Sequence, residues 1–392
     1  MTELRYLDHA ATTPVREEAL AALLEVQREV FGNPSSHHSA GERAAAVLAS
    51  ARGRVARVLR CRPGEVVFTS GGTEADNFAI KGIVLGAPGA RHIITSPIEH
   101  DAVLASVDYL VRLHGVEATF VSVDAAGRVD PAEVAAAVRD DTALVSIAYA
   151  NNEVGTVQPI AEIAAALRAL DRPRSLPGRA WLHTDAVQAA GWLPLDFEAL
   201  GVDAMALAGH KFGAPRGVGA AIIRSRIPLE PLFHGGGQER GRRSGTEFVA
   251  GAVAFATALE LAEADREAAY AAAARSRDAF VEEVLHRIPG ARLTGAEPGP
   301  GRMPHLASFV LPGTAGEGVL LEFERRGLLA SAGSACAAGD DEPSHVLTAM
   351  GVPREEAQTS VRFSLSHRVG EGFDGVAEQL ERAAAAVRGL AT

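Results

Sequence analysis

Short apolar runs alternate with helix-sized segments from about residue 60, and this alternation constrains the fold more than any other feature of the chain. Each run is rich in Val, Ile, Phe or Leu and is bounded by Gly, Asn or Pro, which indicates buried strands. Strands that alternate with helices build a mostly parallel sheet with both faces covered. The seven predicted strands are Glu65–Thr69, Arg91–Thr95, Glu117–Val121, Ala143–Tyr149, Ala180–Thr184, Ala204–Ala208 and Val218–Ile223.

Helices are predicted between these strands, and a different pattern follows them. The intervening helices are Thr73–Leu85, His100–His114, Pro131–Arg139 and Ile160–Ala169. Glu247–His286 predicts one long helix or two. Beyond it we predict strands Arg292–Thr294, Leu306–Leu311 and Gln358–Ser364, and helices Gly316–Arg326, Pro343–Met350 and Gly370–Arg388. We therefore expect an α/β fold, with a large domain of residues 15–260 around the seven-stranded sheet. Residues 1–14 and 261–392 would form a smaller α+β domain, and Leu170–Gly178 a loop.

Charge and cysteine content exclude several classes of protein. The chain has 392 residues, and 38 Lys and Arg oppose 49 Asp and Glu, so the net charge of −11 argues against direct nucleic-acid binding. Two cysteines exclude a disulfide framework and a four-thiolate metal site. The longest nearly uncharged apolar run, Phe248–Leu259, is shorter than the roughly 20 residues of a membrane span. Asp8 and His9 lie where a secretory signal would be apolar, so we expect a cytoplasmic protein without a membrane partner.

One lysine stands in a Gly-rich turn directly after an apolar strand, in Ala208-Gly209-His210-Lys211-Phe212-Gly213. A lysine held in such a turn can form a Schiff base with an aldehyde cofactor when its surroundings favour the neutral amine. The alternative is a solvated loop lysine, which is the commoner case for a single lysine.

Asp185 follows a neighbouring predicted strand, at the edge where open α/β sheets bind ligands. A pyridoxal cofactor needs a carboxylate against its ring nitrogen, and Asp185 fits that requirement. It could equally cap a helix that begins at Ala186.

Further polar and Gly-rich segments follow other strand ends. The turn Ser70-Gly71-Gly72-Thr73-Glu74 could offer the free N–H groups of a helix N-terminus to a phosphate, although any tight strand–helix turn could use these residues. His100 could stack on a flat ring, Asn151-Asn152-Glu153 supplies amide donors, and Gln188 lies one turn beyond Asp185. Taken singly, each is more often a structural polar residue.

Together these residues resemble the cysteine desulfurases of the NifS/IscS type, which are pyridoxal-phosphate-dependent members of the class-V aminotransferases. The resemblance covers the chain from Tyr6 to about Leu365. The motifs that carry it, in order, are Tyr6–Pro14, Phe31–Ser36, Gly71–Asn77, Glu99-His100, Asn151–Gly155, Thr184–Gln188, Gly209–Lys211, His234–Gly237, Arg243–Thr246, Ser334–Cys336 and Arg362–Ser364.

The resemblance implies a pyridoxal-phosphate transferase fold of type I, and a role for each matching residue. Lys211 would hold the cofactor, Asp185 would pair with its ring nitrogen, and His100 would stack on the ring and move protons. Asn152 and Gln188 would contact the ring oxygen, and the phosphate would be bound by Gly72, Thr73 and His210. Thr246 would contact the phosphate bound in the neighbouring subunit, which implies a homodimer with shared sites. Arg362, with Asn152, would bind the substrate.

Cys336 lies in Ser331–Asp341, a run almost free of bulky side chains that predicts a mobile loop at about residues 331–343. The alternative is a buried core thiol. The resemblance implies that Cys336 takes sulfur from L-cysteine as a persulfide, releasing L-alanine, and passes it on. No resident metal is expected, although the resemblance implies that Cys336 can transiently ligate an iron–sulfur cluster with a scaffold. Cys61 is expected to be incidental.

Several alternatives stay open. The acceptor could be an iron–sulfur scaffold or a protein of tRNA thiolation. The enzyme could be a selenocysteine lyase or another class-V aminotransferase, and a rival from another class is a non-catalytic sulfur-relay subunit. Ala208 stands where many relatives carry Ser or Thr, so one hydroxyl contact to the phosphate, worth about 1 kcal/mol, is expected to be missing.

Overall fold

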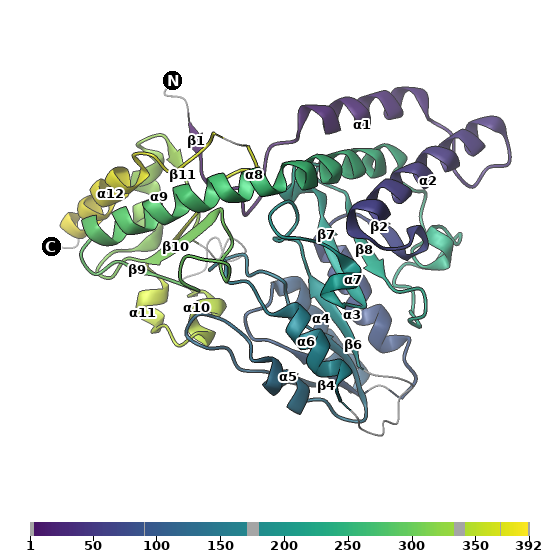
Figure 1. The fold of residues 1–392 in the computed structure, drawn as a ribbon, viewed down its shortest axis with the longest axis horizontal. Helices are drawn as coiled ribbons and strands as arrows, with labels where there is room; N and C mark the ends of the chain where they lie inside the picture. Colours follow the sequence, from purple (N-terminus) through teal and green to yellow (C-terminus); the bar gives the residue numbers. More distant parts are fainter. Residues whose placement is uncertain (1–3, 90, 171–179, 333–341, 369, 391–392) are drawn as a thin grey trace.

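A seven-stranded sheet forms the centre of the larger lobe of the molecule (Figure 1). The computed structural model describes residues 4–89, 91–170, 180–332, 342–368 and 370–390. The strands are β2 (Val66–Thr69), β3 (His92–Thr95), β4 (Glu117–Phe120), β5 (Thr142–Ser146), β6 (Trp181–Asp185), β7 (Ala204–Ala208) and β8 (Gly219–Ile223). Their order is β2-β8-β7-β6-β5-β3-β4, and only β8 runs antiparallel to its neighbours. The predicted strands and the mostly parallel sheet are confirmed.

Both faces of this sheet are buried, as the apolar strands predict, except at the edge strand β4, whose residues are exposed or half-buried. Alternate residues of β2 serve opposite faces: Val67 packs in one apolar cluster, whereas Val66 and Phe68 pack in another. Helices α3 (Gly72–Leu85) and α4 (Asp101–His114) supply the cluster around Val67. The other helices between the strands are α5 (Pro131–Ala136), α6 (Ile160–Arg168) and α7 (Phe197–Leu200).

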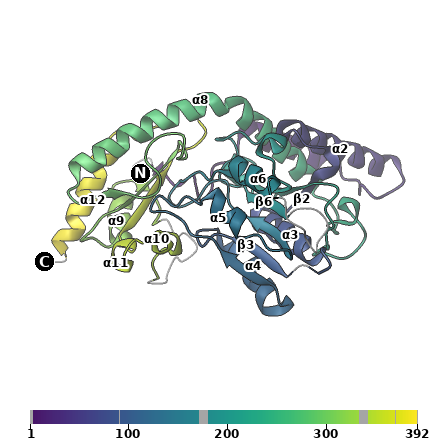
Figure 2. The same cartoon turned by 60° about the horizontal axis from the view of Figure 1, so that its bottom comes forward.

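One long helix, α8 (Val249–Arg287), connects the two lobes (Figure 2). It is a single helix of 39 residues, which decides between the one or two predicted. It packs on α12 (Val376–Leu390) and also on α1 (Glu17–Glu29) and α2 (Ser39–Leu59), two N-terminal helices that we did not predict. Both N-terminal helices are amphipathic, and Leu23 of α1 and Leu48 and Val55 of α2 pack in or against the apolar core.

The smaller lobe contains an antiparallel sheet of order β12-β10-β9. Its strands are β9 (Arg292–Leu293), β10 (Leu306–Val310) and β12 (Ser360–Ser364), and its other helices are α9 (Gly316–Glu324), α10 (His345–Ala349) and α11 (Arg354–Ala357). Phe280 of α8 packs edge-on against Phe309 and Phe363 and stacks on Phe373 with ring centroids 4.5 Å apart. The chain start joins this lobe, because β1 (Arg5–Tyr6) pairs with β11 (Leu328–Leu329).

Several predicted helix boundaries are wrong. The helix predicted at Pro131–Arg139 ends at Ala136, and the helix predicted at Gly316–Arg326 ends at Glu324. The last helix begins at Val376 rather than Gly370, because Gly370 and Gly375 have φ values of +105° and +72°, which no right-handed helix contains. The helix predicted from Pro343 begins at His345, after Ser344, whose hydroxyl accepts the N–H of Leu347 at 3.1 Å. The loop predicted at Leu170–Gly178 lies, after its first residue, outside the described residues.

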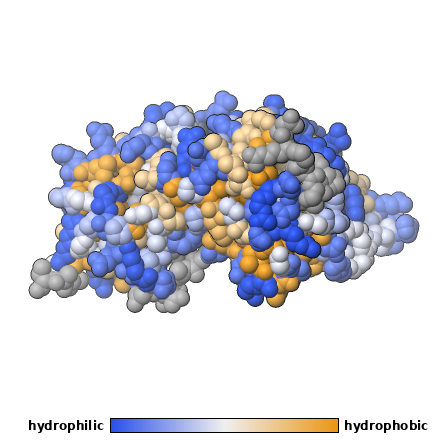
Figure 3. Space-filling view, turned by 90° about the horizontal axis from the view of Figure 1, so that it is seen from below, coloured by the Kyte–Doolittle hydropathy of each residue, from blue (hydrophilic) through white to orange (hydrophobic). Residues whose placement is uncertain are grey.

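The surface mixes charged and apolar residues. On the face in Figure 3, hydrophilic residues surround smaller apolar areas. None of the helices within the described ranges is long and apolar enough to cross a membrane.

Candidate active site

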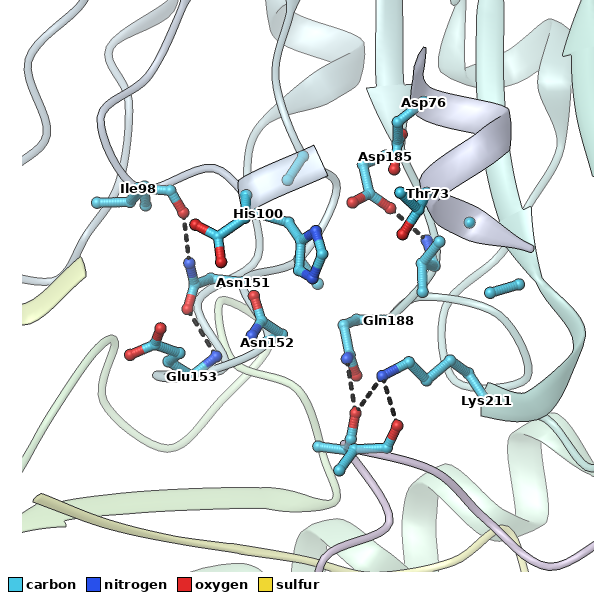
Figure 4. A pocket seen from close by; sticks show the side chains of 18 of the residues that line it. Thr73, Asp76, Ile98, His100, Asn151, Asn152, Glu153, Asp185, Gln188 and Lys211 are labelled. Atoms are coloured by element: carbon cyan, nitrogen blue, oxygen red, sulfur yellow. Dashed lines mark hydrogen bonds between the residues drawn. The ribbon is translucent and has the colours of Figure 1, made fainter. Parts of the chain in front are cut away.

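A cavity of about 590 Å³ lies at the carboxyl ends of β5, β6 and β7, where both lobes contribute to its lining (Figure 4). Parallel strands place their carboxyl ends at one edge, so residues far apart in sequence meet there. Nine of the predicted site residues line this cavity: Gly72, Thr73, His100, Asn152, Asp185, Gln188, His210, Lys211 and Arg362.

Lys211 ends the 3₁₀ turn Gly209–Lys211 directly after β7. Its Nζ donates hydrogen bonds to the carbonyl oxygens of Ala10 at 2.6 Å and Ala11 at 2.9 Å. Gln188 donates from Nε2 to the same Ala10 oxygen at 2.9 Å, and the bonds converge in Figure 4. The interpretation of Lys211 as a solvated loop lysine is therefore wrong: the amine lies in the cavity and is held by the protein.

Asp185 is the last residue of β6 and is buried. Its Oδ1 accepts the N–H of Val187 at 2.8 Å, but the residues that follow form turns rather than a helix, so the helix-cap interpretation is wrong. Burial raises the pKa of Asp185, and the charges of His100 and Lys211 partly offset this. Within the described part of the chain, no ion pair neutralises this carboxylate by direct contact.

Two further buried acids lie near Asp185. Burial, with repulsion from Asp185 and Glu99, raises the pKa of Asp76 on α3 well above its ordinary value. Burial likewise raises the pKa of Glu99 to about 8. Asp76 Oδ1 lies 3.6 Å from Nε2 of His183, whose pKa burial lowers to about 3. Burial thus disfavours the charged forms of Asp76, Glu99 and His183, which limits the charge beside Asp185.

The start of α3 offers N–H groups to an anion. No side chain caps the helix at Gly71, and both Gly72 and Thr73 line the cavity. A Cβ on Gly72 would lie 2.8 Å from Val187 Cγ2, so only glycine allows this close approach. His210 adds a neutral imidazole, because burial and the nearby charges of Lys211 and Arg216 lower its pKa to about 4.

The smaller lobe contributes Arg362 of β12 to the cavity lining, and its side chain is 1% exposed. Its Nη1 donates to the carbonyl of Asn152 at 2.8 Å, and its Nη2 contacts Asp8 Oδ1 at 2.8 Å. Asn151, beside Asn152, has a structural role: its Oδ1 accepts the N–H groups of Glu153 and Val154, both at 2.9 Å.

Two predicted site residues, Thr246 and Cys336, are not among the described residues that line the cavity. Thr246 is exposed and does not line it, so its contact with a neighbouring subunit stays a prediction. Cys336 and most of its predicted loop lie outside the described residues, so the mobility of that loop stays a prediction too. The residues at the strand ends did not predict Asp76, Asp8, Ala10 or Ala11 as parts of the site, although the motif Tyr6–Pro14 includes the last three.

Comparison with known proteins identifies the family of this chain. A family model for aminotransferase class-V matches residues 5–371. The chain belongs to the class-V aminotransferase family. An IscS-like cysteine desulfurase of Mycobacterium tuberculosis is 45% identical, covering 98% of this chain and 97% of its own length. A cysteine desulfurase IscS of Methanosarcina thermophila is 43% identical, covering 95% and 90% respectively. The solved structure of a NifS-like protein superposes with a TM-score of 0.86 at 35% identity over 99% of both chains. The resemblance seen in the motifs is confirmed.

Enzymes of this family depend in general on pyridoxal phosphate, and the cavity fits that cofactor. It combines an amine, a buried carboxylate without an ion-pair partner among the described residues, and an uncapped helix start beside a neutral histidine. These are the partners that the aldehyde, the ring nitrogen and the phosphate of the cofactor need.

Proposed function

We propose that this chain is a cysteine desulfurase that converts L-cysteine to L-alanine and transfers the sulfur to Cys336 as a persulfide. The observation that carries the proposal is the convergence of Lys211, Asp185 and Arg362 on one cavity, in a chain whose relatives are named cysteine desulfurases. This combination provides an amine, a buried carboxylate and a carboxylate-binding guanidinium within a single site.

Pyridoxal phosphate would be held by the residues that line the cavity. Lys211 would bind it covalently through Nζ, and Asp185 would pair with the ring nitrogen. His100 would stack on the ring, and the other contacts would be Asn152 and Gln188 to the ring oxygen and Gly72, Thr73 and His210 to the phosphate. When bound, the cofactor supplies an electron sink for the electron pair released at the substrate Cα.

The chain's own residues then divide the work. Arg362 binds the substrate carboxylate through its planar donors, which fixes the Cα–H bond over the site. Lys211 or His100 takes the Cα proton, and a proton is returned to the substrate carbon skeleton from the same side chains. Burial raises the pKa of Glu99 to about 8, which disfavours a second negative charge beside Asp185.

Cys336 completes the reaction as the nucleophile. Its thiolate attacks the substrate Sγ, so that an S–S bond forms while the substrate Cβ–Sγ bond breaks and Cβ takes up a proton. Alanine leaves, and the persulfide is available to an acceptor protein of iron–sulfur cluster assembly or tRNA thiolation. With a scaffold, Cys336 would also ligate a cluster transiently.

We infer a homodimer in which Thr246 reaches the cofactor phosphate of the other subunit, and a cytoplasmic location. We also infer the division into a domain of residues 15–260 and one of residues 1–14 and 261–392, although α8 runs through residue 260 without a break.

The purified holoenzyme tests the function directly. With L-cysteine, one alanine should form per sulfur, and the first sulfur should appear on the peptide that contains Cys336, detected by mass spectrometry after thiol alkylation. Turnover of selenocysteine but not cysteine would support a selenocysteine lyase, and amino transfer to a keto acid would support an aminotransferase. Absence of cofactor absorbance would support a non-catalytic subunit.

A further inference from the structure

The segment Asp8–Thr13, here called the N-terminal strap, contacts four of the residues that line the cavity. The Ala10 and Ala11 carbonyls accept from Lys211, and the Ala10 carbonyl also accepts from Gln188. Thr12 Oγ1 lies 3.2 Å from Nδ1 of His210, and the N–H of Thr13 donates to the His210 carbonyl at 3.1 Å. Asp8 pairs with Arg362 at 2.8 Å. The strap is thus a part of the site itself.

The backbone of the strap is fixed by the smaller lobe. Leu7 donates to the carbonyl of Leu329 at 2.8 Å and accepts from the N–H of Ser364 at 2.7 Å. The hydroxyl of Ser364 accepts the N–H of Ala10 at 2.8 Å, and the hydroxyl of Tyr6 donates to the Asp8 carbonyl at 3.0 Å. Because these bonds fix the chain on both sides of Asp8, the Asp8 carboxylate is kept close to Arg362.

We propose that Asp8 is a positioning residue that holds the Arg362 guanidinium in the orientation needed to bind the substrate carboxylate. The proposal rests on the proposed function, in which Arg362 makes that contact. Asp8 at Nη2 and the Asn152 carbonyl at Nη1 fix two corners of the planar group. A guanidinium has five N–H donors, so these two contacts are compatible with a further carboxylate.

The ion pair also compensates the burial of Arg362, whose side chain is 1% exposed against 19% for Asp8. A buried cation that loses a charged acceptor becomes costly and shifts towards water or another acceptor. Removing the Asp8 charge should therefore displace the guanidinium from its binding orientation. The competing hypothesis is that Asp8 occupies the place of the substrate carboxylate, in which case removing its charge would strengthen substrate binding.

The two hypotheses predict opposite changes for Asp8→Asn. The holoenzyme is titrated with L-alanine, which has the carboxylate, and with ethylamine, which is alanine without it, and binding is followed by the cofactor absorbance. We expect Asp8→Asn to weaken alanine binding at least ten-fold and to change ethylamine binding by less than two-fold. With L-cysteine as substrate, KM should rise by a similar factor while kcat changes less than two-fold.

A matched control is Asp265→Asn, which breaks an ion pair of the same 2.8 Å length with Arg16 and does not line the cavity. It should leave both affinities unchanged. In Arg362→Gln, adding Asp8→Asn should cause no further loss of alanine binding, because the residue that Asp8 positions is already absent.

Three outcomes would overturn the proposal: tighter alanine binding in Asp8→Asn, equal loss for alanine and ethylamine, or a further loss when Asp8→Asn is added to Arg362→Gln. Melting temperatures of all variants show whether they fold. Failure of the proposed function is seen separately, because then wild type releases no alanine from cysteine or Arg362→Gln binds alanine normally.

Discussion

Glu99 accepts the backbone N–H of Ala148 at 2.9 Å, a contact that ties the loop after β3 to the loop after β5. The Ser96 hydroxyl donates to the other carboxyl oxygen at 2.6 Å. The Glu99 carbonyl is 3.0 Å from Nε2 of His345, which donates to it from the smaller lobe. Because His100 follows directly in the chain, this buried acid fixes the backbone from which the proposed ring-stacking histidine projects.

Stability should therefore depend on the ionisation of Glu99. Burial raises the pKa of Glu99 from 4.5 to about 8 in the folded protein, whereas the unfolded chain keeps the ordinary value. Between these pH values the folded state binds more protons at Glu99, so this residue makes the free energy of unfolding fall as pH rises from about 4.5 to about 8, by several kcal/mol. Glu99→Gln should make the fall between pH 5 and pH 8.5, measured by urea unfolding, smaller by that amount and leave the share of Asp76 and Asp185.

The amide of Gln can donate to Ser96 and accept from Ala148, so the variant should retain the fold. Glu267→Gln is the control. The Glu267 side chain is 90% exposed, so this substitution should not change the free energy of unfolding at either pH. An unaltered pH dependence in Glu99→Gln would mean that other groups cause it.

The two cysteines should behave differently. Burial raises the pKa of Cys61 to about 12, so it carries almost no thiolate at neutral pH. Cys61→Ser should keep sulfur transfer within two-fold of wild type. Cys336→Ser should keep the cofactor absorbance but reduce alanine release from cysteine by at least a hundred-fold. If Cys336→Ser still accumulates protein-bound persulfide, the assignment of the nucleophile is wrong.

Lys211→Ala should abolish covalent attachment of the cofactor. Sodium borohydride should fix a pyridoxyl group on the wild-type peptide that contains Lys211 and on no peptide of the variant, as read by mass spectrometry. Lys211→Arg is the matched comparison. Its guanidinium can still donate hydrogen bonds to the carbonyls of Ala10 and Ala11, but it forms no covalent bond with the cofactor. Labelling of a different lysine in wild type would contradict the proposed anchor.

Gly191 should tolerate no side chain. It has φ of +77°, and a Cβ would lie 2.6 Å from Nε2 of His367, which stacks on Trp192 with centroids 4.2 Å apart. Gly191→Ala should lower the free energy of unfolding by about 3 kcal/mol or more, combining backbone strain with a buried clash. Gly217→Ala isolates the backbone contribution, because Gly217 has φ of +85° with no atom near the added Cβ, and should cost only about 1 kcal/mol. Both variants are compared by thermal unfolding. If Gly191→Ala and Gly217→Ala lose the same free energy of unfolding, the clash with His367 is relieved by local movement.

The strands of the large sheet and the residues at their ends could be predicted from the sequence because their signals are local. A parallel strand buried on both faces appears as a continuous apolar run, and its end is marked by the turn that carries Asp185 or Lys211. Since the carboxyl ends of parallel strands meet at one edge of the sheet, the place of the site could be predicted, but not the distances between its residues. Helices α1 and α2 were not predicted although both are amphipathic, because they precede β2 and so lie outside the alternation of strands and helices on which the prediction rests.

Only the tertiary structure decided how the N-terminal strap enters the site. Asp8 and Arg362 are 354 positions apart, and no local pattern relates them. Their contact depends on β1 pairing with β11 and on Ser364 accepting the N–H of Ala10, which are long-range hydrogen bonds. The sequence by itself therefore determined the sheet and the chemical groups at its edge, since both depend on neighbours along the chain. The charge partner of Arg362 and the carbonyl partners of Lys211 depend on how the two lobes pack, and only the folded chain specifies that packing.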